Sequence, residues 1–290
     1  MGQGHGEKCR CLSTKTIPMT YDPAFIKEEI LKIVSLSFRK ITPSNLEKIV
    51  CEKFALKKKT AKQIIKEMVS SEELAYVNLY GLTFIEKSFG KPVKVGSRII
   101  LSPPDRNPMA KPGEVIVNIM GGASFGSGDH ATTRLCLQGL DQVMESHGQM
   151  KHFKTGSCLD IGTGSGVLVI AAVKMGMAKG LGLDMDPNAL SESQQNVMLN
   201  GLDSKIRIEN FPLESLAESF PLILANLRFP TLLALSSKIS ALCVPSGVLV
   251  LSGFRPEEFP DLLKAYQREE FEETWHGEEK NWGAMVLKKT

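Results

Sequence analysis

The most informative segment of the chain reads LDIGTGSGVL, residues 159–168. An apolar strand leads into three closely spaced glycines, and an apolar run then predicts a helix. Glycine lets a backbone turn sharply and approach a ligand, and the first turn of a helix offers unpaired N–H groups. Because ligands of open α/β sheets bind beyond the carboxyl ends of the strands, this segment predicts a ligand site at residues 162–166.

The expected ligand is a nucleoside without a pyrophosphate. The dinucleotide fingerprint G-x-G-x-x-G needs a glycine where this chain has Val167, which argues against an NAD-dependent oxidoreductase. Asp184 follows Gly162 by 22 residues, at the end of the next predicted strand, and its two acceptor oxygens match the vicinal hydroxyls of a ribose. Asp186 makes the surroundings acidic, which favours a cationic ligand such as a sulfonium.

A small-residue loop precedes this site and reads GGASFGSGDHATTRL, residues 121–135. Phe125 can cover an aromatic base. Thr132 and Thr133 can cap the following predicted helix and also face a ligand, and a cap alone is the alternative. His130 is either structural or a proton-transfer group.

Asn226 follows the fourth strand-like run of this region, residues 221–225. Its amide offers both a donor and an acceptor at the crevice, although an asparagine that merely ends a strand is the alternative. The Asn-Pro-Pro-aromatic signature for methylation of planar nitrogens is absent. Asn226 is therefore the candidate catalytic residue.

Strands and helices alternate through the second half of the chain, which is typical of a parallel sheet covered on both faces. A long helix is expected over residues 230–242, and residues 270–275 and 282–288 predict an antiparallel pair at the sheet edge, joined by a polar turn over 276–280. The other strand-like runs are residues 97–101, 115–120, 157–161, 180–184, 205–209, 221–225 and 248–251.

Together these segments resemble the class I S-adenosylmethionine-dependent methyltransferases, and more narrowly the family that methylates ribosomal protein L11. The resemblance covers roughly residues 92–290. The matching segments are the family's F-G-T-G-x-H-x-T-T loop at 125–133, residues 160–166 and 184–187, Asn196 with Asn200-Gly201, residues 225–227, and the closing strand at 282–288.

The resemblance implies an α/β fold with a seven-stranded, doubly wound, Rossmann-like sheet and S-adenosyl-L-methionine as cofactor. It implies that the cofactor contacts come from Phe125, Thr133, Gly162, Gly164, Asp184 and Asn226. Family members methylate amines of lysines and of an N-terminus, so a protein substrate, specifically a ribosomal protein, is expected. The mechanistic hypothesis is in-line transfer to a nitrogen that Asn226 orients.

The chain departs from the family pattern at several positions. Ser127 replaces the usual threonine, Ala131 the usual proline, and Gly121-Gly122 stands where Asp-Pro-Gly is common. The family's N-terminal recognition domain is ferredoxin-like, whereas here three predicted helices precede a hairpin that pivots at Gly81. That is the order of a winged-helix module, so two alternatives stay open: a methyltransferase for RNA or a small molecule, and a non-catalytic ligand-sensing regulator.

Four parts are expected along the chain: a flexible tail (1–17), a helical, winged-helix-like recognition domain (18–90), a connector with strands (91–122) and the methyltransferase domain (123–290). Residues 1–112 hold 20 Lys and Arg against 11 Asp and Glu, and the remainder holds 15 against 21. The basic front half contains Lys57, Lys58, Lys59 and Lys62 at the third predicted helix. This cluster suits nucleic acid, protein docking or a plain solvated face.

Composition excludes several classes of protein. Apolar residues make up 42% and charged residues 23%, which argues against a disordered or collagen-like chain. No apolar run approaches a membrane span, and the polar start lacks the apolar block of a secretory signal. The six cysteines are scattered, and Cys9-x-Cys11 is a poor zinc signature. We therefore expect a cytoplasmic protein without a metal site or membrane contact.

Overall fold

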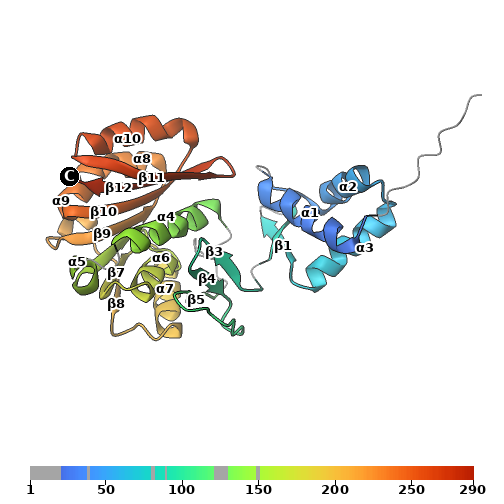
Figure 1. The fold of residues 1–290 in the computed structure, drawn as a ribbon, viewed down its shortest axis with the longest axis horizontal. Coiled ribbons are helices and arrows are strands. Elements are labelled where there is room, and N and C mark those ends of the chain that lie inside the picture. The colour runs from blue at the N-terminus through green and yellow to red at the C-terminus, as the bar shows by residue number, and fades with distance from the viewer. Residues whose placement is uncertain (1–20, 38–39, 80–81, 89, 121–129, 148–150) are drawn as a thin grey trace, which may run out of the picture.

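The computed structural model describes residues 21–37, 40–79, 82–88, 90–120, 130–147 and 151–290. Figure 1 shows two groups of elements, a small helical domain and a larger α/β domain, joined by the chain around β3. Each group has its own core, because the buried side chains of the helical domain form a cluster that shares no member with the two clusters on the large sheet.

The N-terminal helical domain contains three helices followed by an antiparallel strand pair, in the predicted order. Asp22 caps the first helix by accepting from the Ala24 N–H at 2.9 Å, and Thr42 caps the second by accepting from Asn45. Ile41 forms an antiparallel bridge with Ile85. The elements are α1 (Pro23–Leu36), α2 (Pro43–Phe54), α3 (Lys58–Ser70), β1 (Leu74–Leu79) and β2 (Leu82–Lys87). The winged-helix interpretation of this order stays a prediction.

A three-stranded sheet that the sequence did not predict as a unit follows the helical domain. Its order is β3-β4-β5, with β3 antiparallel and β5 parallel to β4. Ile99, Leu101 and Val117 are buried in the core beneath α4 and α6. The strands are β3 (Val93–Val95), β4 (Ile99–Ser102) and β5 (Val115–Asn118).

The large sheet has seven strands in the order β11-β12-β10-β9-β6-β7-β8. The strands from β10 to β8 run parallel, and β12 pairs antiparallel with both β10 and β11, which places the late strand pair at the edge as predicted. This confirms the seven-stranded, doubly wound α/β fold. The strands are β6 (Ser157–Ile161), β7 (Lys179–Leu183), β8 (Ile206–Glu209), β9 (Phe220–Asn226), β10 (Cys243–Phe254), β11 (Phe271–Glu279) and β12 (Trp282–Lys289).

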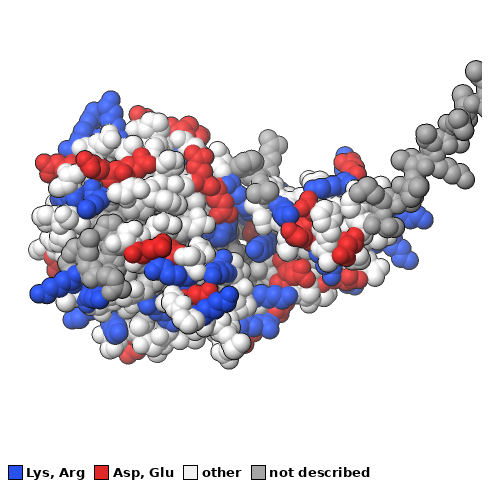
Figure 2. Space-filling view, in the orientation of Figure 1, with Lys and Arg blue, Asp and Glu red and all other residues white. Residues whose placement is uncertain are grey.

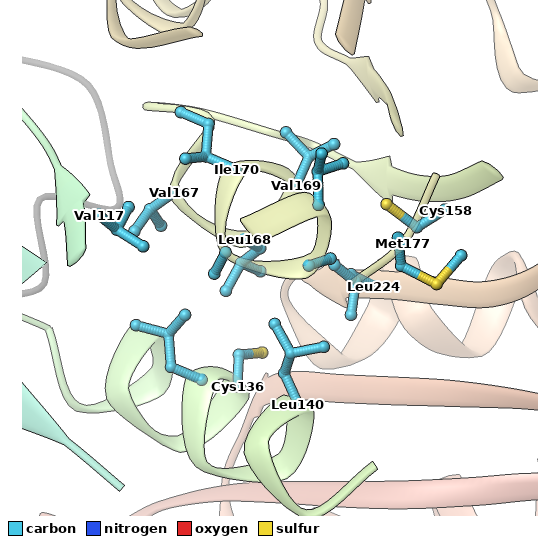
Figure 3. Packing of buried hydrophobic residues seen from close by; sticks show 14 of the residues in the cluster. Val117, Cys136, Leu140, Cys158, Val167, Leu168, Val169, Ile170, Met177 and Leu224 are labelled. Carbon is cyan, nitrogen blue, oxygen red and sulfur yellow. The ribbon is translucent and has the colours of Figure 1, made fainter. Parts of the chain in front are cut away.

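Helices cover both faces of this sheet, because its strand side chains alternate between two apolar cores. Cys158 faces the core that contains α4, α6 and α7, while Leu159 faces the core that contains α8, α9 and α10. Figure 3 shows Leu168 of α6 facing Cys136 and Leu140 of α4. The helices are α4 (Ala131–His147), α5 (Lys151–Thr155), α6 (Val167–Lys174), α7 (Pro187–Leu199), α8 (Phe229–Ala234), α9 (Ser236–Leu242) and α10 (Phe259–Gln267).

Some predicted boundaries were wrong. The helix expected over 230–242 is two helices, because the backbone turns at Leu235, where φ is −90° and ψ −1°. The polar turn expected over 276–280 is shorter, since β11 continues to Glu279 and only two residues separate it from β12. The strand expected over 97–101 begins at Ile99. Among the described residues, no helix is both long and apolar enough to cross a bilayer.

Candidate active site

The predicted ligand crevice lies where the sheet reverses its winding. The first parallel strand, β6, lies between β9 and β7, and Ile161 pairs with Ala225 on one side and Leu183 on the other. The carboxyl ends of these three strands therefore meet at one edge. In open α/β sheets such a switch point is where ligands bind, and the glycine loop lies at this point.

The glycine loop is held close to its neighbouring strands. Gly162 and Gly164 have positive φ values of 71° and 54°, a backbone region that side chains rarely adopt. The Gly162 N–H donates to the Leu183 carbonyl at 2.8 Å. A Cβ atom on Gly162 would lie 2.6 Å from Cδ2 of Leu227, the residue after Asn226. The loop thus contacts the ends of both β7 and β9, and glycine is required for that contact.

Asp184, the predicted ribose ligand, is half-buried directly after β7. Its Oδ2 accepts from the Gly164 N–H at 2.9 Å, and its Oδ1 accepts from the Asp186 N–H at 3.0 Å. Two backbone donors therefore fix the orientation of the carboxylate. A carboxylate has about four acceptor positions, so both oxygens of Asp184 can still accept from a vicinal diol.

Asp160 is a completely buried carboxyl group beneath the loop. Burial, with a smaller contribution from the charge of Asp184, raises its pKa to about 7. Its Oδ2 accepts from the Thr163 hydroxyl at 2.7 Å and from the Val169 N–H at 3.3 Å. Its Oδ1 has no hydrogen-bond partner among the described residues. This acid therefore holds the loop on the first turn of α6 and leaves one acceptor unsatisfied.

The first turn of α4 contributes Thr133 and His130 to the same edge of the sheet. Thr132 and Thr133 lie inside the helix, which begins at Ala131, so the capping alternative is wrong. Thr133 is buried, and its hydroxyl has no partner in the described part of the chain. His130 lies 2.8 Å from the Thr132 hydroxyl through Nδ1. Burial, together with the positive charges of Arg134 and Lys40, lowers the pKa of His130 to about 4, so its ring is neutral at pH 7.

Asn226, the predicted catalytic residue, is the last residue of β9 and is half-buried. It pairs with Ser252 of β10, and the Leu227 N–H donates to the Ser252 carbonyl at 3.0 Å. No side-chain hydrogen bond of Asn226 to another described residue is present. Both the donor and the acceptor of its amide are therefore free to bind a ligand.

Trp282 forms a further wall of this edge that the sequence analysis did not single out. Trp282 is the first residue of β12. The Arg255 guanidinium lies over its indole ring, with Cζ 3.7 Å from the ring centroid. The His130 ring packs against it in an edge-on arrangement at 5.2 Å. Arg134 of α4 forms a bidentate ion pair with Glu279 next to it, with 3.0 and 3.2 Å from Nε to the two oxygens. Arg255, His130 and the Arg134–Glu279 ion pair thus surround the start of β12.

Asn196 of α7 and Asn200, directly after this helix, join two parts of the site; the sequence analysis named them only through the family resemblance. Asn196 is fully buried, donates to the Ser165 carbonyl at 2.9 Å and accepts from the Met120 N–H at 3.0 Å. Asn200 pairs with the backbone of Asn118 in both directions, at 3.0 and 2.7 Å. These amides hold the glycine loop and the end of β5 at fixed positions. Their spacing of four residues on one helix face was the available signal.

Two site predictions have no structural outcome. Phe125 lies outside the described residues, as does the Gly121-Gly122 lead-in to its loop. The structure brings together the other predicted residues, which are Thr133, Gly162, Gly164, Asp184 and Asn226. Within the described ranges, no group of three or more His, Cys, Asp or Glu residues could hold a metal ion.

The order of the seven strands and the site along their carboxyl edge are those of a class I methyltransferase fold, as the sequence predicts. A solved structure with this fold, the ribosomal protein L11 methylase of Lactobacillus delbrueckii subsp. bulgaricus, matches with a TM-score of 0.60. The match has 24% sequence identity and covers 69% of this chain and 100% of that chain. At this identity the likeness shows the fold alone.

The family model described as ribosomal protein L11 methyltransferase (PrmA) matches residues 54–290, and the chain belongs to this family. The ribosomal protein L11 methyltransferase of Pelobacter propionicus is 34% identical over 199 residues, which cover 69% of this chain and 63% of that protein. The one of Geotalea daltonii is 35% identical over 175 residues, 59% of this chain and 56% of that protein. The chain thus spans less than two thirds of the length of these relatives. S-adenosyl-L-methionine, the predicted cofactor, is the cofactor of the family.

Proposed function

We propose that this chain is an S-adenosylmethionine-dependent methyltransferase that modifies an amine, of a lysine or of an N-terminus, on a ribosomal protein. The observation that carries the proposal is the position of Asp184 and Asn226 after β7 and at the end of β9, on either side of the glycine loop. Membership of a family described as ribosomal protein L11 methyltransferase supports the substrate class. A cytoplasmic location, expected from the scattered cysteines, accompanies this proposal.

The residues present fit this cofactor. Asp184 offers an oriented carboxylate to the ribose, and Gly162 and Gly164 place no side chain between the backbone and a ligand. The unpartnered Thr133 hydroxyl and Asp160 Oδ1 are buried polar atoms whose desolvation is costly unless a ligand or water satisfies them. When bound, S-adenosylmethionine supplies an electrophilic methyl group on a sulfonium.

The side chains around His130 can help to prepare an amine without a dedicated base. A lysine has a pKa near 10.4 in water and needs a neutral nitrogen to react. The positive charges of Arg255, Lys280 and Arg134 disfavour an ammonium nearby, as they disfavour protonated His130. The Asn226 amide oxygen accepts from the amine.

Methyl transfer to purified ribosomal protein L11 tests this proposal. The chain is incubated with methyl-labelled cofactor, and the modified amine is located by mass spectrometry. We expect Asn226→Ala to lower kcat about a hundredfold, because loss of alignment is that costly, while the Kd of the demethylated cofactor changes less than about threefold. Asn226→Asp keeps the acceptor oxygen and is expected to retain more activity than the alanine variant.

Incubation of the chain with methyl-labelled cofactor and a cell extract separates the remaining alternatives. The basic face of α3 favours an RNA methyltransferase as the second candidate, which predicts label in the RNA fraction of a cell extract. A non-catalytic regulator predicts cofactor binding without label in any fraction. Near-normal transfer by Asn226→Ala would contradict the role proposed for this residue.

A further inference from the structure

We propose that the N-terminal helical domain is a winged-helix module that binds the phosphate backbone of nucleic acid through one face of α3. The supporting geometry begins with α2 and α3, which are separated by only residues 55–57. Ala55 has a left-handed backbone, with φ 52° and ψ 37°, which turns the chain sharply between the helices. A three-residue turn between two packed helices is the form of a helix-turn-helix unit, whose second helix contacts nucleic acid.

The strands complete the arrangement. β1 and β2 form an antiparallel pair after α3, in the position of a wing. Ile41, between α1 and α2, forms a β-bridge with Ile85 of β2. The Ile85 N–H donates to the Ile41 carbonyl at 2.8 Å. The segment between α1 and α2 is thereby joined to the strand pair that follows α3. The domain core holds α3 through Ala61, Ile65 and Met68, which leaves its other face exposed.

The exposed face of α3 is a lysine ridge, which we define as Lys58, Lys59, Lys62 and Lys66. At 100° per residue these four side chains fall within an arc of about 100°, separate from the buried arc. Figure 2 shows blue side chains projecting from the end of the helical domain where Figure 1 draws α3. The large apolar side chains that are exposed in the described part of this domain lie on other elements than α3: Phe25 on α1, Ile49 on α2, Tyr76 on β1 and Leu82 on β2.

The lysines of the ridge lack carboxylate partners among the described residues, whereas all the described lysines of α1 and α2 have one. Each of those others lies within 4.0 Å of a carboxylate, in the pairs Lys27–Glu67, Lys32–Glu28, Lys48–Glu52 and Lys53–Glu29. None of the four ridge lysines forms an ion pair with a described residue. Among the described lysines of α1, α2 and α3, those without a carboxylate partner thus lie on one face of α3, where an external polyanion can neutralise their charge.

The position of these charges also disfavours a purely structural role. Lys57, Lys58 and Lys59 stand at the start of α3, which has no acidic residue in its first turn and no side-chain cap. The N-terminal end of a helix carries partial positive charge, so cations there destabilise the helix. Phosphate bound at this end would gain from both the lysines and the helix dipole. The major groove of a duplex is about 12 Å wide and admits a helix.

Fluorescence anisotropy of the full chain with a labelled DNA duplex and an RNA hairpin tests the proposal. We expect binding to both nucleic acids or to one of them, with an affinity that falls steeply between 50 and 200 mM salt. The variant Lys58→Gln, Lys59→Gln, Lys62→Gln should bind about tenfold or more weakly at 50 mM salt, and its log–log salt slope should fall by about 2 to 3. Which arm binds distinguishes DNA from RNA.

The matched control is Lys154→Gln, Lys179→Gln, Lys205→Gln, which removes the same charge from exposed lysines of the methyltransferase domain. This control should keep the wild-type affinity and slope. The ridge variant should melt at or above the wild-type temperature without nucleic acid, since it relieves repulsion at the helix start, so weaker binding is not unfolding. Absence of binding at 50 mM salt, equal loss in both variants, or equally tight binding of polyglutamate would overturn the proposal.

Discussion

Asp184 is the residue through which the site proposal can be tested most directly. Both of its oxygens accept backbone N–H bonds, from Gly164 and Asp186. In Asp184→Asn one oxygen becomes an amide donor that faces an N–H group, and the charge is lost. Because hydrogen bonds to charged groups contribute about 1.5–3 kcal/mol, we expect the Kd of the demethylated cofactor to rise about tenfold to a hundredfold by calorimetry.

Asp186→Asn is the control for that measurement. Asp186 is exposed and caps α7 by accepting from the Asn188 N–H at 2.9 Å, a role that asparagine performs equally well. The Kd of the demethylated cofactor for this variant should stay within about threefold of the wild-type value. If Asp184→Asn binds as tightly as Asp186→Asn, the carboxylate is not the ribose ligand.

The protonation of Asp160 should be visible in the pH dependence of stability. Its pKa is about 7 in the folded chain against 3.8 as its ordinary value, so the folded state binds more protons between these pH values. The contribution of Asp160 to the free energy of unfolding is therefore fully present below pH 4. It decreases as the pH rises from 4 to 7. Relative to Asp160→Asn, which cannot titrate, the wild-type melting temperature should fall between pH 5 and 7.5 and then level off. A constant difference over this range would show that Asp160 does not titrate there.

Among the elements, α7 holds two other parts of the site through the buried amide of Asn196. Asn196→Ala leaves the Ser165 carbonyl and the Met120 N–H without this partner. Each buried unsatisfied group costs about 1–3 kcal/mol, so we expect a loss of about 2–4 kcal/mol in the free energy of unfolding by urea denaturation. Gln195→Ala, an exposed neighbour, should change it by less than about 0.5 kcal/mol. Equal effects of the two variants would contradict the bridging role.

The elements that local signals mark could be predicted from the sequence. The Asp22-Pro23 start of α1, the glycine loop after β6 and the alternation of strands and helices all depend on neighbouring residues. The break at Leu235 could not, because neither glycine nor proline marks it. The parallel pairing of β4 with β5 depends on contacts between distant parts of the chain, for which a single sequence carries no signal.

The site residues also divide into those with a local sequence signal and those without one. Gly162, Asp184 and Asn226 were predictable because each follows directly on a strand-like run, so that their side of the sheet could be inferred. The wall formed by Trp282 and Arg255 was not, since it depends on the antiparallel insertion of β12 beside β10. The resemblance to a known family suggested Asn196, but its contact with Ser165 spans 31 residues and needed the structure.

For the whole molecule, separate cores predict separate unfolding. The cluster of the helical domain shares no residue with the sheet cores. Polar contacts such as Arg106–Glu72 and the Lys280 amine to the Val34 carbonyl are weak links between them. We expect two transitions in calorimetry. A hundredfold excess of demethylated cofactor over its Kd should raise only one of them, by about 5–10 °C. A single transition that shifts as a unit would contradict this independence.

The division of the chain into two cores has a consequence for how such enzymes diversify. The residues proposed for methyl transfer lie on the sheet and its helices, whereas the lysine ridge lies on a domain whose core shares no residue with that framework. Recombination could therefore exchange the front module for another targeting module without disturbing the chemistry behind it. Related enzymes would then act on different targets in the cell with the same catalytic site.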